Sequence, residues 1–573
     1  MADMTRWGSA PLVEVDGVAL PPDVLPLLEE VVVDDSCHLP DVVELRLRDD
    51  GRDVAQRCGL RLGATVRVSA RQLGTAESVP LLIAEVATLE ADIGPRGHRL
   101  LVRGYDASWR LAQTRRTTAH VDVTDGDAVR RIAGLAGVGV GQVDATPVVH
   151  PHLAQIDLTD WEFLQLRARA CGLECVVVKG ELHFRAPRAA GQAPEAAVPG
   201  QEPRRHQLVV GANLLQFRPR LTAHGQVRDV EVRGWDAAAK RAVVGRAATT
   251  SGGALALEHP AQLAVVSGGA VHVAVRSGPT TQAEADQAAA ALAEVVGSTS
   301  LEARGTTMGD PSLTAGTAVH VVGAGRAFDG RYVLTTTRHV YDSRGYRTSF
   351  EVSGRQERSL AGLLGGPAAA PTGVGVAVGE VTDVRDPLSQ GRVRVRLPWL
   401  SETYESWWAR VTQLGAGNGR GSAFLPEVGD EVLVAFEQGD LRRPVVVGGL
   451  HNGVDALPLA DGLVDATSGA VQRRGFVSRE GHRLVLDDSR DAPGVVVETG
   501  DGGVRVALSA RDTVVEISSR GEVTISGSTG VTVTSDAGLT LHARGRLELK
   551  GDAGVSVSGG PEVSVSAAQV RLG

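Results

Sequence analysis

Apolar and polar positions alternate with a fixed period of eight along the last sixty residues of the chain. Each octad holds an apolar residue, any residue and a second apolar residue, followed mostly by Gly, Ser, Thr, Asp, Arg and Ala. Residues two apart on a strand point to the same face, so each octad presents one apolar pair. The pairs are Val515/Ile517, Val523/Ile525, Val531/Val533, Leu539/Leu541, Leu547/Leu549, Val555/Val557 and Val563/Val565.

One octad is too short for a full coil of a single-chain solenoid, yet each apolar pair needs a surface to bury it. Three identical chains wound around one axis would supply that surface. We therefore predict a trimeric, intertwined β-helix over residues 479–573, a needle whose buried core is formed by the pairs from Val515 to Val557. At about 4.8 Å per layer, seven octads give a needle of roughly 35 Å. An edge-to-edge sandwich and a single-chain solenoid are the alternatives.

Short segments with strand-like alternation dominate residues 1–360, as in VELRLR and TVRVSA. Half-buried strands of barrels or sandwiches alternate in this way. Three stretches break the pattern and predict helices, over residues 125–140, 157–170 and the Ala-rich 280–296. These features predict a mainly β hub with some α, made of barrel-like domains.

The starts of two of these helices have candidate capping residues. Asp125 or Asp127 could begin the first helix, and Thr159 or Asp160 could cap the second. In the second helix, three apolar residues fall on one face and predict its buried side. They are Trp161, Leu164 and Ala168.

A Gly-, Pro- and Ala-rich stretch at 361–373 predicts a linker after the hub. Residues 374–453 then hold five short apolar strands, VAVGEVTDV, RVRVRLPW, SWWARVTQL, DEVLVAFE and PVVVGGL. Five strands in some 75 residues are typical of a small Greek-key barrel such as an OB-fold. Residues 454–478 are predicted to link this barrel to the needle.

Composition narrows the function classes. The chain has 573 residues, 43% hydrophobic and 22% charged, with a net charge of −9. A negative balance disfavours nucleic acid and anionic membranes as partners. The first residues, MADMTRWGSAPLVEV, show neither the basic nor the apolar region of a secretory signal, and no run of eighteen apolar residues predicts a membrane helix.

Candidate chemistry is sparse. Cys171 and Cys175 with His183 form a conceivable metal site, but buried free thiols are the more ordinary interpretation. The His150/His152 pair and His38 beside Cys37 are interpreted in the same way, as scattered core or surface residues. We therefore predict no catalytic, cofactor-binding or metal-binding residues, and no enzyme activity.

Two Gly-rich loops and one aromatic group have alternative interpretations. GAGRAFDG (323–330) precedes a strand-like segment, so no helix N-terminus follows to receive a phosphate, and GAGNGRG (415–421) lies within the barrel. Trp399, Trp407 and Trp408 cluster within ten residues. On an OB-fold such rings can stack on bases or sugars, but we predict that they serve the core and a subunit interface.

The segments GEVTDVRDPLSQGRVRVRLPWL (379–400) and ESWWARVTQLGAGNGRGSAFLPEVGDEVLVAFEQGDLRRPVVVGGLHNG (405–453) closely resemble the OB-fold domain of the VgrG family. These are spike proteins of contractile injection systems and phage tails. LTDWEFLQLRARACGLECVV and the region from TQAEADQAAAALAE to YRTSFEV resemble the family's hub, shared with phage tail control proteins. With the octads, the likeness covers nearly the whole chain.

The resemblance implies a structural role. The chain would be a homotrimeric central spike that joins a sixfold tail tube (Hcp-like) and baseplate to a threefold, membrane-piercing needle. The blunt end would carry a PAAR-type tip protein, docked on Val563, Val565, Val570, Leu572 and Gly573. Assembly would occur in the cytoplasm within a particle, and firing would eject or release the spike.

Two choices stay open at this point. A type VI secretion spike, a contractile phage tail spike and an extracellular phage-tail-like particle are alternatives within the same class. The rival from another class is an OB-fold protein that binds carbohydrate or nucleic acid through Trp407 and Trp408, or an enzyme on a spike-like scaffold.

Overall fold

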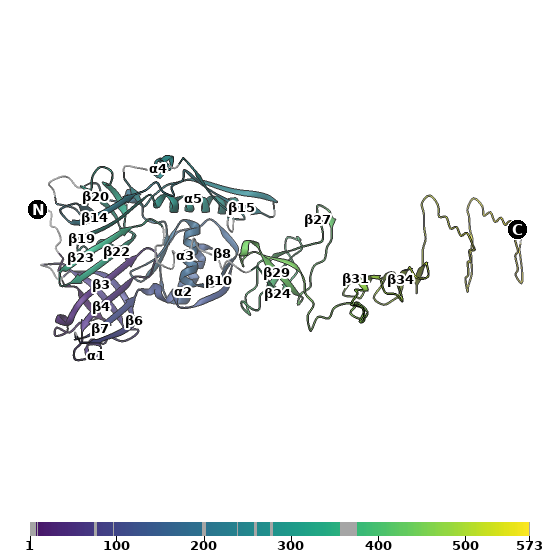
Figure 1. Cartoon of the computed structure of the whole chain (residues 1–573), viewed down its shortest axis with the longest axis horizontal. Helices are drawn as coiled ribbons and strands as arrows, with labels where there is room; N and C mark the ends of the chain where they lie inside the picture. Colours follow the sequence, from purple (N-terminus) through teal and green to yellow (C-terminus); the bar gives the residue numbers. More distant parts are fainter. Residues whose placement is uncertain are drawn as a thin grey trace. The chain divides into compact units, whose positions relative to one another are not determined.

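The computed structural model describes residues 7–571, except 9, 74–76, 96, 197–201, 238, 257–259, 267, 276–278 and 356–374. The predicted 361–373 linker therefore lies outside the described residues. The chain divides into two compact units, Met1–Asn452 and Gly453–Gly573. The elements of both units are mainly β-strands (Figure 1).

The hub is organised around one sheet of eleven strands, drawn in purple to teal in Figure 1. Along β4, alternate residues Val43, Leu45 and Leu47 are buried while Glu44 and Arg46 face outward, as the alternating sequence predicts. In sheet order the strands are β14 (Leu214–Leu221), β19 (Leu301–Met308), β23 (Gly345–Val352), β22 (Thr336–Asp342), β3 (Leu28–Ser36), β4 (Val42–Arg48), β7 (Gly97–Tyr105), β6 (Ser78–Gly94), β5 (Thr65–Arg71), β1 (Leu12–Val15) and β2 (Val18–Ala19).

The predicted barrel-like domains are joined by this sheet. Strand β22 pairs antiparallel with β3, with Tyr341 opposite Val31, so the sheet combines strands from both ends of the hub sequence. Two separate apolar cores lie along it. One contains Val43, Leu45 and Val66, and the other contains Leu301, Tyr332 and Phe350. The hub is therefore two lobes that share one sheet.

A mixed α/β layer connects the two lobes along the chain. Its helices are α2 (Asp125–Ala136) and α3 (Asp160–Cys171). Thr159 caps α3, as one of the two predicted capping residues, and the predicted face with Trp161, Leu164 and Ala168 is buried. The strands are β8 (Arg115–Thr124), β9 (Gly139–Val143), β10 (Val149–Thr159), β11 (Glu174–Val178) and β12 (Glu181–Arg185).

Two boundaries differ from the sequence prediction. The first helix was expected to run from 125 to 140 but ends at Ala136, because Gly137 turns left-handed (φ 66°) and the chain continues into β9. Its N-cap is Thr124, and Asp127 closes the capping box from the third helical position. Residues 157–159 belong to β10, not to the second helix.

The Ala-rich prediction corresponds to α5 (Gln282–Ser298), which Thr281 caps. This helix packs on a three-stranded sheet of β15 (Asp229–Asp236), β16 (Arg241–Ala248) and β18 (Val271–Ala274). A four-stranded sheet contains β13 (Gln207–Val209), β20 (Ala318–Val322), β21 (Gly330–Val333) and β17 (Ala254–Leu255). The short helices of the hub are η1 (Leu25–Leu27), α1 (Val54–Arg57), η2 (Ala107–Ala112), η3 (Ala190–Gln192) and α4 (Pro260–Val266).

The five strands expected over 374–453 close into a barrel, which confirms the OB-type prediction. The order is β24 (Val376–Asp383), β25 (Arg392–Arg396), β26 (Ala409–Val411), β30 (Pro444–Gly449) and β29 (Glu431–Phe436). Alternate residues such as Val393, Val395, Val432 and Val434 are fully buried inside it. The GAGNGRG loop forms a small hairpin, β27 (Ala416–Gly417) and β28 (Arg420–Gly421), and η4 spans Glu437–Gly439.

The second unit contains an antiparallel meander that the sequence patterns did not predict. Its strands are β31 (Arg473–Val477), β32 (Arg483–Asp487), β33 (Gly494–Glu498), β34 (Val504–Ser509) and β35 (Val514–Ser519). Val515 and Ile517 pair with Leu508 and Val506. Residues 520–571 contain no strand, because a strand needs a hydrogen-bonded neighbour that this part of one chain does not provide.

Candidate functional site

The hub and the barrel share an apolar core along β10. Ala154 and Ile156 of β10 belong to the same buried cluster as Val381, Val395 and the other barrel residues. Beside them, Nε2 of His152 donates a hydrogen bond to the carbonyl of Glu405 over 3.1 Å. The α/β layer and the barrel are therefore packed against each other, and side chains from both meet at this junction.

The predicted aromatic cluster lies partly at this junction. The guanidinium carbon of Arg394 is 5.4 Å from the ring centroid of Trp407 and 5.3 Å from that of Trp408, within cation–π range. The His152 ring lies 5.8 Å from Trp407, whereas Trp399 is half exposed. Arg394 thus lies over both rings that a stacked base or sugar would use, and this favours the predicted packing role.

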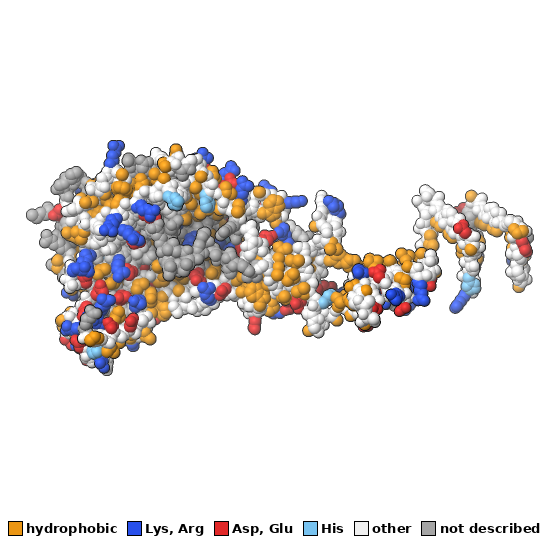
Figure 2. Space-filling view, viewed as in Figure 1, with side chains coloured by type: hydrophobic (Ala, Val, Ile, Leu, Met, Phe, Trp, Pro, Cys, Tyr) orange, Lys and Arg blue, Asp and Glu red, His pale blue; other side chains and the backbone are white. Residues whose placement is uncertain are grey.

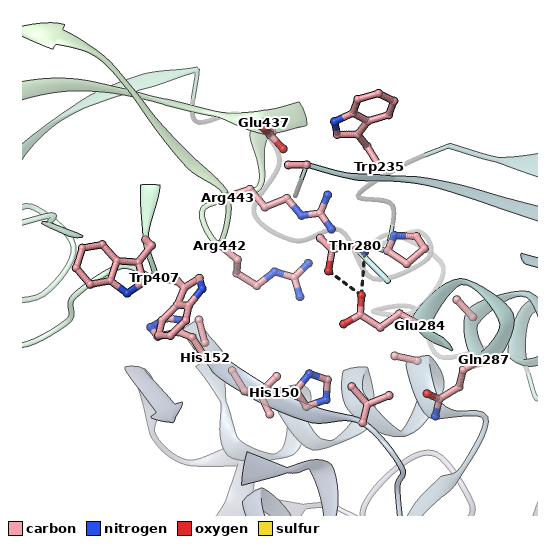
Figure 3. A pocket seen from close by; sticks show the side chains of 18 of the residues that line it. His150, His152, Trp235, Thr280, Glu284, Gln287, Trp407, Glu437, Arg442 and Arg443 are labelled. Atoms are coloured by element: carbon pink, nitrogen blue, oxygen red, sulfur yellow. Dashed lines mark hydrogen bonds between the residues drawn. The ribbon is translucent and has the colours of Figure 1, made fainter. Parts of the chain in front are cut away.

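A cavity of about 660 Å³ opens at the junction (Figure 3). Its walls come from β10, α3, β15, the start of α5 and the barrel loops around β25, β26 and β30. Figure 3 shows Arg442 and Arg443 extending from the barrel toward Glu284, which accepts hydrogen bonds from the hydroxyl and backbone N–H of Thr280. The cavity therefore combines aromatic walls with charged groups of both signs.

Two cations on the barrel side of the cavity are held by barrel carboxylates. Arg442 pairs with the buried Asp440 at 2.7 Å, and Arg392 pairs with Asp386 at 2.6 Å. Burial opposes ionisation of Asp440, but the hydrogen bonds and charge of Arg442 hold its pKa below the ordinary value. These pairs fix the barrel loops, and they leave little net charge for an ionic ligand in this cavity.

A Cys–His–Asp group lies at one wall of the cavity, where it has the residue types of a nucleophilic site. Asp125, at the start of α2, accepts hydrogen bonds from Nε2 of His150 (3.1 Å), Nε of Arg167 (2.5 Å) and Sγ of Cys171 (3.2 Å). Burial and the Asp125 charge raise the pKa of Cys171 to about 12. Its thiol is therefore neutral at physiological pH, and the group ties α2, β10 and α3 together instead of activating a nucleophile.

The other candidate metal residues are held by structural contacts. Cys175 is fully buried, and burial raises the pKa of its thiol, which therefore stays protonated at physiological pH. Nδ1 of His183 accepts the backbone N–H of Gln142. Burial also raises the pKa of Cys37, and Nε2 of His38 lies 3.4 Å from the carbonyl of Gly354. Among the described residues, no cluster of three or more His, Cys, Asp or Glu is placed to hold a metal ion.

The residues of the predicted needle core are exposed in the single chain, and the prediction places their burial between three copies of the chain. All twelve are 54–74% exposed, and apolar side chains recur along the C-terminal segment (Figure 2). The physical reason is that one octad supplies a single extended stretch, and no other part of the described chain covers its apolar pair. The exposed residues are Val515, Ile517, Val523, Ile525, Val531, Val533, Leu539, Leu541, Leu547, Leu549, Val555 and Val557.

The backbone of this segment follows the same period as its side chains. It bends at 528–529, 536–537, 544–545, 552–553 and 560–561, once in every eight residues. Each stretch between bends carries one apolar pair, so the octad is a structural unit as well as a sequence period. Burial of the pairs in a needle stays a prediction that requires other copies of the chain.

The proposed tip-docking residues divide in two. Val563, Val565 and Val570 are at least half exposed, at the end of the described chain. Leu572 and Gly573 lie outside the described residues. Among the described helices, none is long and apolar enough to cross a membrane.

Two family models match the chain. Residues 377–451 match the "Type VI secretion system/phage-baseplate injector OB domain", which corresponds to the closed barrel. Residues 86–342 match the "Alg8 N-terminal domain".

Curated relatives match short parts of the chain. The type VI secretion system spike protein VgrG1c of Pseudomonas aeruginosa is 39% identical over 108 residues, which cover 18% of this chain and 15% of that protein. VgrG3 of Vibrio cholerae is 39% identical over 74 residues, covering 12% of this chain and 7% of that protein. The chain thus spans only a small part of the length of these relatives in the matched alignments.

The similarity in fold extends much further. A chain of the Francisella PdpA–VgrG complex, in its half-lidded form, matches 90% of this chain and 88% of its own length, with a TM-score of 0.52 and 8% sequence identity. This match includes most of the region assigned to the Alg8 N-terminal domain. The resemblance predicted from the sequence is therefore confirmed: the chain has a VgrG-type fold, carries the type VI secretion system/phage-baseplate injector OB domain and is similar in sequence to VgrG spike proteins.

Proposed function

We propose that the chain is the structural central spike of a contractile injection machine. Three copies would form a hub, a collar of OB barrels and a needle, and sheath contraction would drive the assembly through an envelope. The observation that carries this proposal is the row of exposed apolar pairs at octad spacing. A chain that exposes one Val, Ile or Leu pair in every octad requires a partner with the same period, and a second and third copy of the chain meet that requirement.

The barrel supports the same oligomer. Its interior is closed, yet several large apolar side chains lie on its outer surface, where Figure 2 shows apolar side chains gathered. Isolated surface apolar residues are ordinary, but a group of them on one small barrel is typical of an interface. They are Leu388 (60% exposed), Trp399 (51%), Leu414 (87%), Phe424 (55%), Leu425 (46%) and Val428 (61%).

The partners follow from the same proposal. The hub would meet a tail tube (Hcp-like) protein and baseplate proteins. The end of the needle, at Val563, Val565, Val570, Leu572 and Gly573, would receive a PAAR-type tip protein. The domains would be the hub (1–360), the linker (361–373), the OB-fold (374–453), a second linker (454–478) and the needle (479–573). The end of the second linker forms β31, and the needle region begins with the other strands of the same meander. No catalysis is required, because the work is mechanical.

The native mass of the purified full-length chain tests the proposal first. Light scattering at low micromolar concentration and moderate salt should give three times the chain mass of 59.8 kDa. A monomer that stays folded under these conditions would contradict the trimeric spike. A truncation before residue 520 separates the contribution of the octads to trimer formation from that of the hub and barrel. The proposal expects the truncated chain to form weaker trimers.

The binding-protein alternative has one observation in its favour, since Trp235 and Trp407 both line the junction cavity. Substituting Trp407 and Trp408 together by Ala tests it. The alternative requires loss of a glycan-binding or gel-shift signal in a variant that still assembles. The spike proposal expects no such signal in either protein.

A further inference from the structure

A second cavity, of about 820 Å³, lies in the hub, and none of its lining residues belongs to the junction cavity. It is formed by segments that are far apart in sequence: the β11–β12 turn, the approach to β13, the loop between β19 and β20, and the beginning of β6. We call it the hub cavity. The proposed spike mechanism does not use it.

The charges around the hub cavity are strongly one-sided. Four cationic side chains line it, Lys179, Arg188, Arg204 and Arg205, against one carboxylate, Asp310. The chain as a whole has a net charge of −9, so this local excess of positive charge runs against the overall balance. The cavity is therefore a positively charged site in a protein that is acidic overall.

These four cationic side chains lack the carboxylate partners that many other arginines of the hub have. Elsewhere in the hub, Arg185 pairs with Glu174 at 3.0 Å, and Arg103 pairs with Glu44 at 2.9 Å. Among the described residues, Lys179, Arg188, Arg204 and Arg205 form no ion pair with a carboxylate. Arg205 instead points its Nε to Nε2 of His206 at 3.2 Å. Burial, and then the charge of Arg205, lower the pKa of His206.

The cavity wall also contains a hydrogen-bonding group without a partner. The hydroxyl of Ser312 is buried and makes no hydrogen bond within the described structure, whereas its backbone N–H is held by Asp310. A buried hydroxyl left in this state costs free energy of folding. The apolar part of the wall includes Val79, Val178 and Met308, each 37–49% exposed.

We propose that the hub cavity binds an acidic peptide segment of a partner protein. Carboxylates of such a segment would pair with Arg188, Arg204 and Lys179. Its apolar side chains would cover Val79, Val178 and Met308. A nucleic acid fits less well, because its phosphates would meet an acidic protein outside the cavity and its polar backbone would not cover these apolar walls.

Fluorescence anisotropy on the full-length protein tests this site. The probe is a labelled ten-residue peptide of Glu and Leu, compared with the same peptide in which Gln replaces every Glu. We expect the acidic peptide to bind at least tenfold more tightly, and to lose affinity as salt rises because exposed charges are screened. The double variant Arg188→Glu/Arg204→Glu should weaken binding at least tenfold. Arg131→Glu, an exposed arginine on α2 outside the cavity, should leave it unchanged.

Four results would overturn the proposal. Equal affinity for the Glu and Gln peptides would show that charge does not drive binding. If Arg131→Glu lost as much affinity as the double variant, the binding would reflect the overall charge of the protein and not this cavity. Tighter binding of a duplex DNA oligonucleotide, or complete displacement of the peptide by millimolar inorganic phosphate, would assign the cavity to another ligand class. Arg188→Gln/Arg204→Gln should also lose binding with an unchanged melting temperature, which separates lost binding from lost folding. The proposal does not rest on the trimer, because all the residues that line the cavity belong to one chain.

Discussion

The OB barrel and the octad segment use the same local sequence pattern with opposite outcomes. In the barrel, the apolar, any, apolar triplets Val393–Val395 and Val432–Val434 are completely buried at their apolar positions. In the octads, Val531 and Val533 have the same spacing and are 56% and 65% exposed. The difference lies in closure. Five strands of one chain surround the barrel core, whereas each octad supplies a single stretch to a layer that needs other chains.

The alternating pattern of a strand therefore predicts which face of the strand is buried. It does not predict whether the same chain or another chain covers that face. In the barrel, β24 pairs with β25 and β29 of the same chain, so the neighbours are local. The first pair, Val515/Ile517, lies in β35 beside β34, but the octads after residue 520 have no comparable neighbour along their own chain. The barrel core is therefore expected to close within a single chain, whereas formation of the needle core is expected to depend on protein concentration.

The largest effect is expected from a charge in the barrel core. Val434→Asp places a carboxylate where the side chain is fully buried, among Val381, Val395 and Val446. An unpaired buried charge costs on the order of 5 kcal/mol, enough to unfold a barrel of this size. Thermal unfolding followed by circular dichroism should show loss of the barrel transition. Val434→Ala, which only leaves a cavity, should retain the fold with a lower melting temperature.

The matching change in the octads should spare the chain and break the assembly. Val531→Asp or Val533→Asp would place three like charges near one axis in the proposed trimer, although each site is exposed in a single chain. We expect light scattering to show fewer trimers while unit Met1–Asn452 keeps its melting temperature. Thr532→Asp, between the two valines and on the opposite face of the stretch, is the control and should leave the mass unchanged. A Val531→Asp protein with full trimers and an unaltered transition would contradict the needle.

Local patterns allowed much of this fold to be predicted. Alternation along β4, the capping sequence at Thr159 and the Ala-rich run of α5 each require only neighbouring residues. The pairing of β22 with β3 joins residues about 300 apart, and no spacing in the sequence specifies it. The meander over 473–519 was not predicted for a different reason: its strands pair in chain order, but most of its apolar residues do not follow the octad period.

The candidate sites show the same division. The octad pairs could be identified residue by residue, since their period is local. The hub cavity could not, because Lys179, Arg204 and Met308 come from separate segments that only tertiary packing brings together. The packing of Arg394 over Trp407 and Trp408 likewise depends on the pairing of β25 with β26, because the two tryptophans directly precede β26. The aromatic cluster was visible in the sequence, but its cation became evident only in the folded barrel.

The two parts of the first unit should respond to pH in opposite directions. In the hub, burial raises the pKa of Asp106 to about 6 and raises that of Asp41, whose carbonyl accepts the Asp106 N–H. A raised pKa means that the folded hub binds the proton more tightly than the unfolded chain does. The protonated Asp106 therefore stabilises the folded hub fully below pH 4, and this stabilisation is lost as pH rises through about 6. The difference between a pKa of about 6 in the folded hub and the ordinary value of 3.8 corresponds to about 3 kcal/mol.

In the barrel, the pKa of Asp386 is lowered, chiefly by its hydrogen bond with Arg392. Burial opposes the same shift at Asp440, but Arg442 still lowers the pKa of that carboxyl. The barrel contribution is therefore present above pH 4 and lost as pH falls below it. Hydrogen exchange of peptides from each region, corrected for intrinsic rates, should show hub protection falling between pH 5 and 8 while barrel protection holds. Asp106→Asn should flatten the hub response; a hub profile that is already flat in the unaltered protein would contradict the burial argument.

The smallest effect is expected where the barrel surface meets β10. Arg394→Gln keeps hydrogen-bonding character in the side chain but removes the charge that lies over Trp407 and Trp408. Partly exposed cation–π contacts contribute about 1 kcal/mol, so the barrel should remain closed and the free energy of unfolding should fall by about that amount. Arg394→Lys, which keeps a cation without the planar guanidinium, should recover part of the loss. Tryptophan fluorescence during urea unfolding measures both variants, and equal stability of Arg394→Gln and the unaltered protein would show that the two rings are held by packing against His152 and the barrel alone.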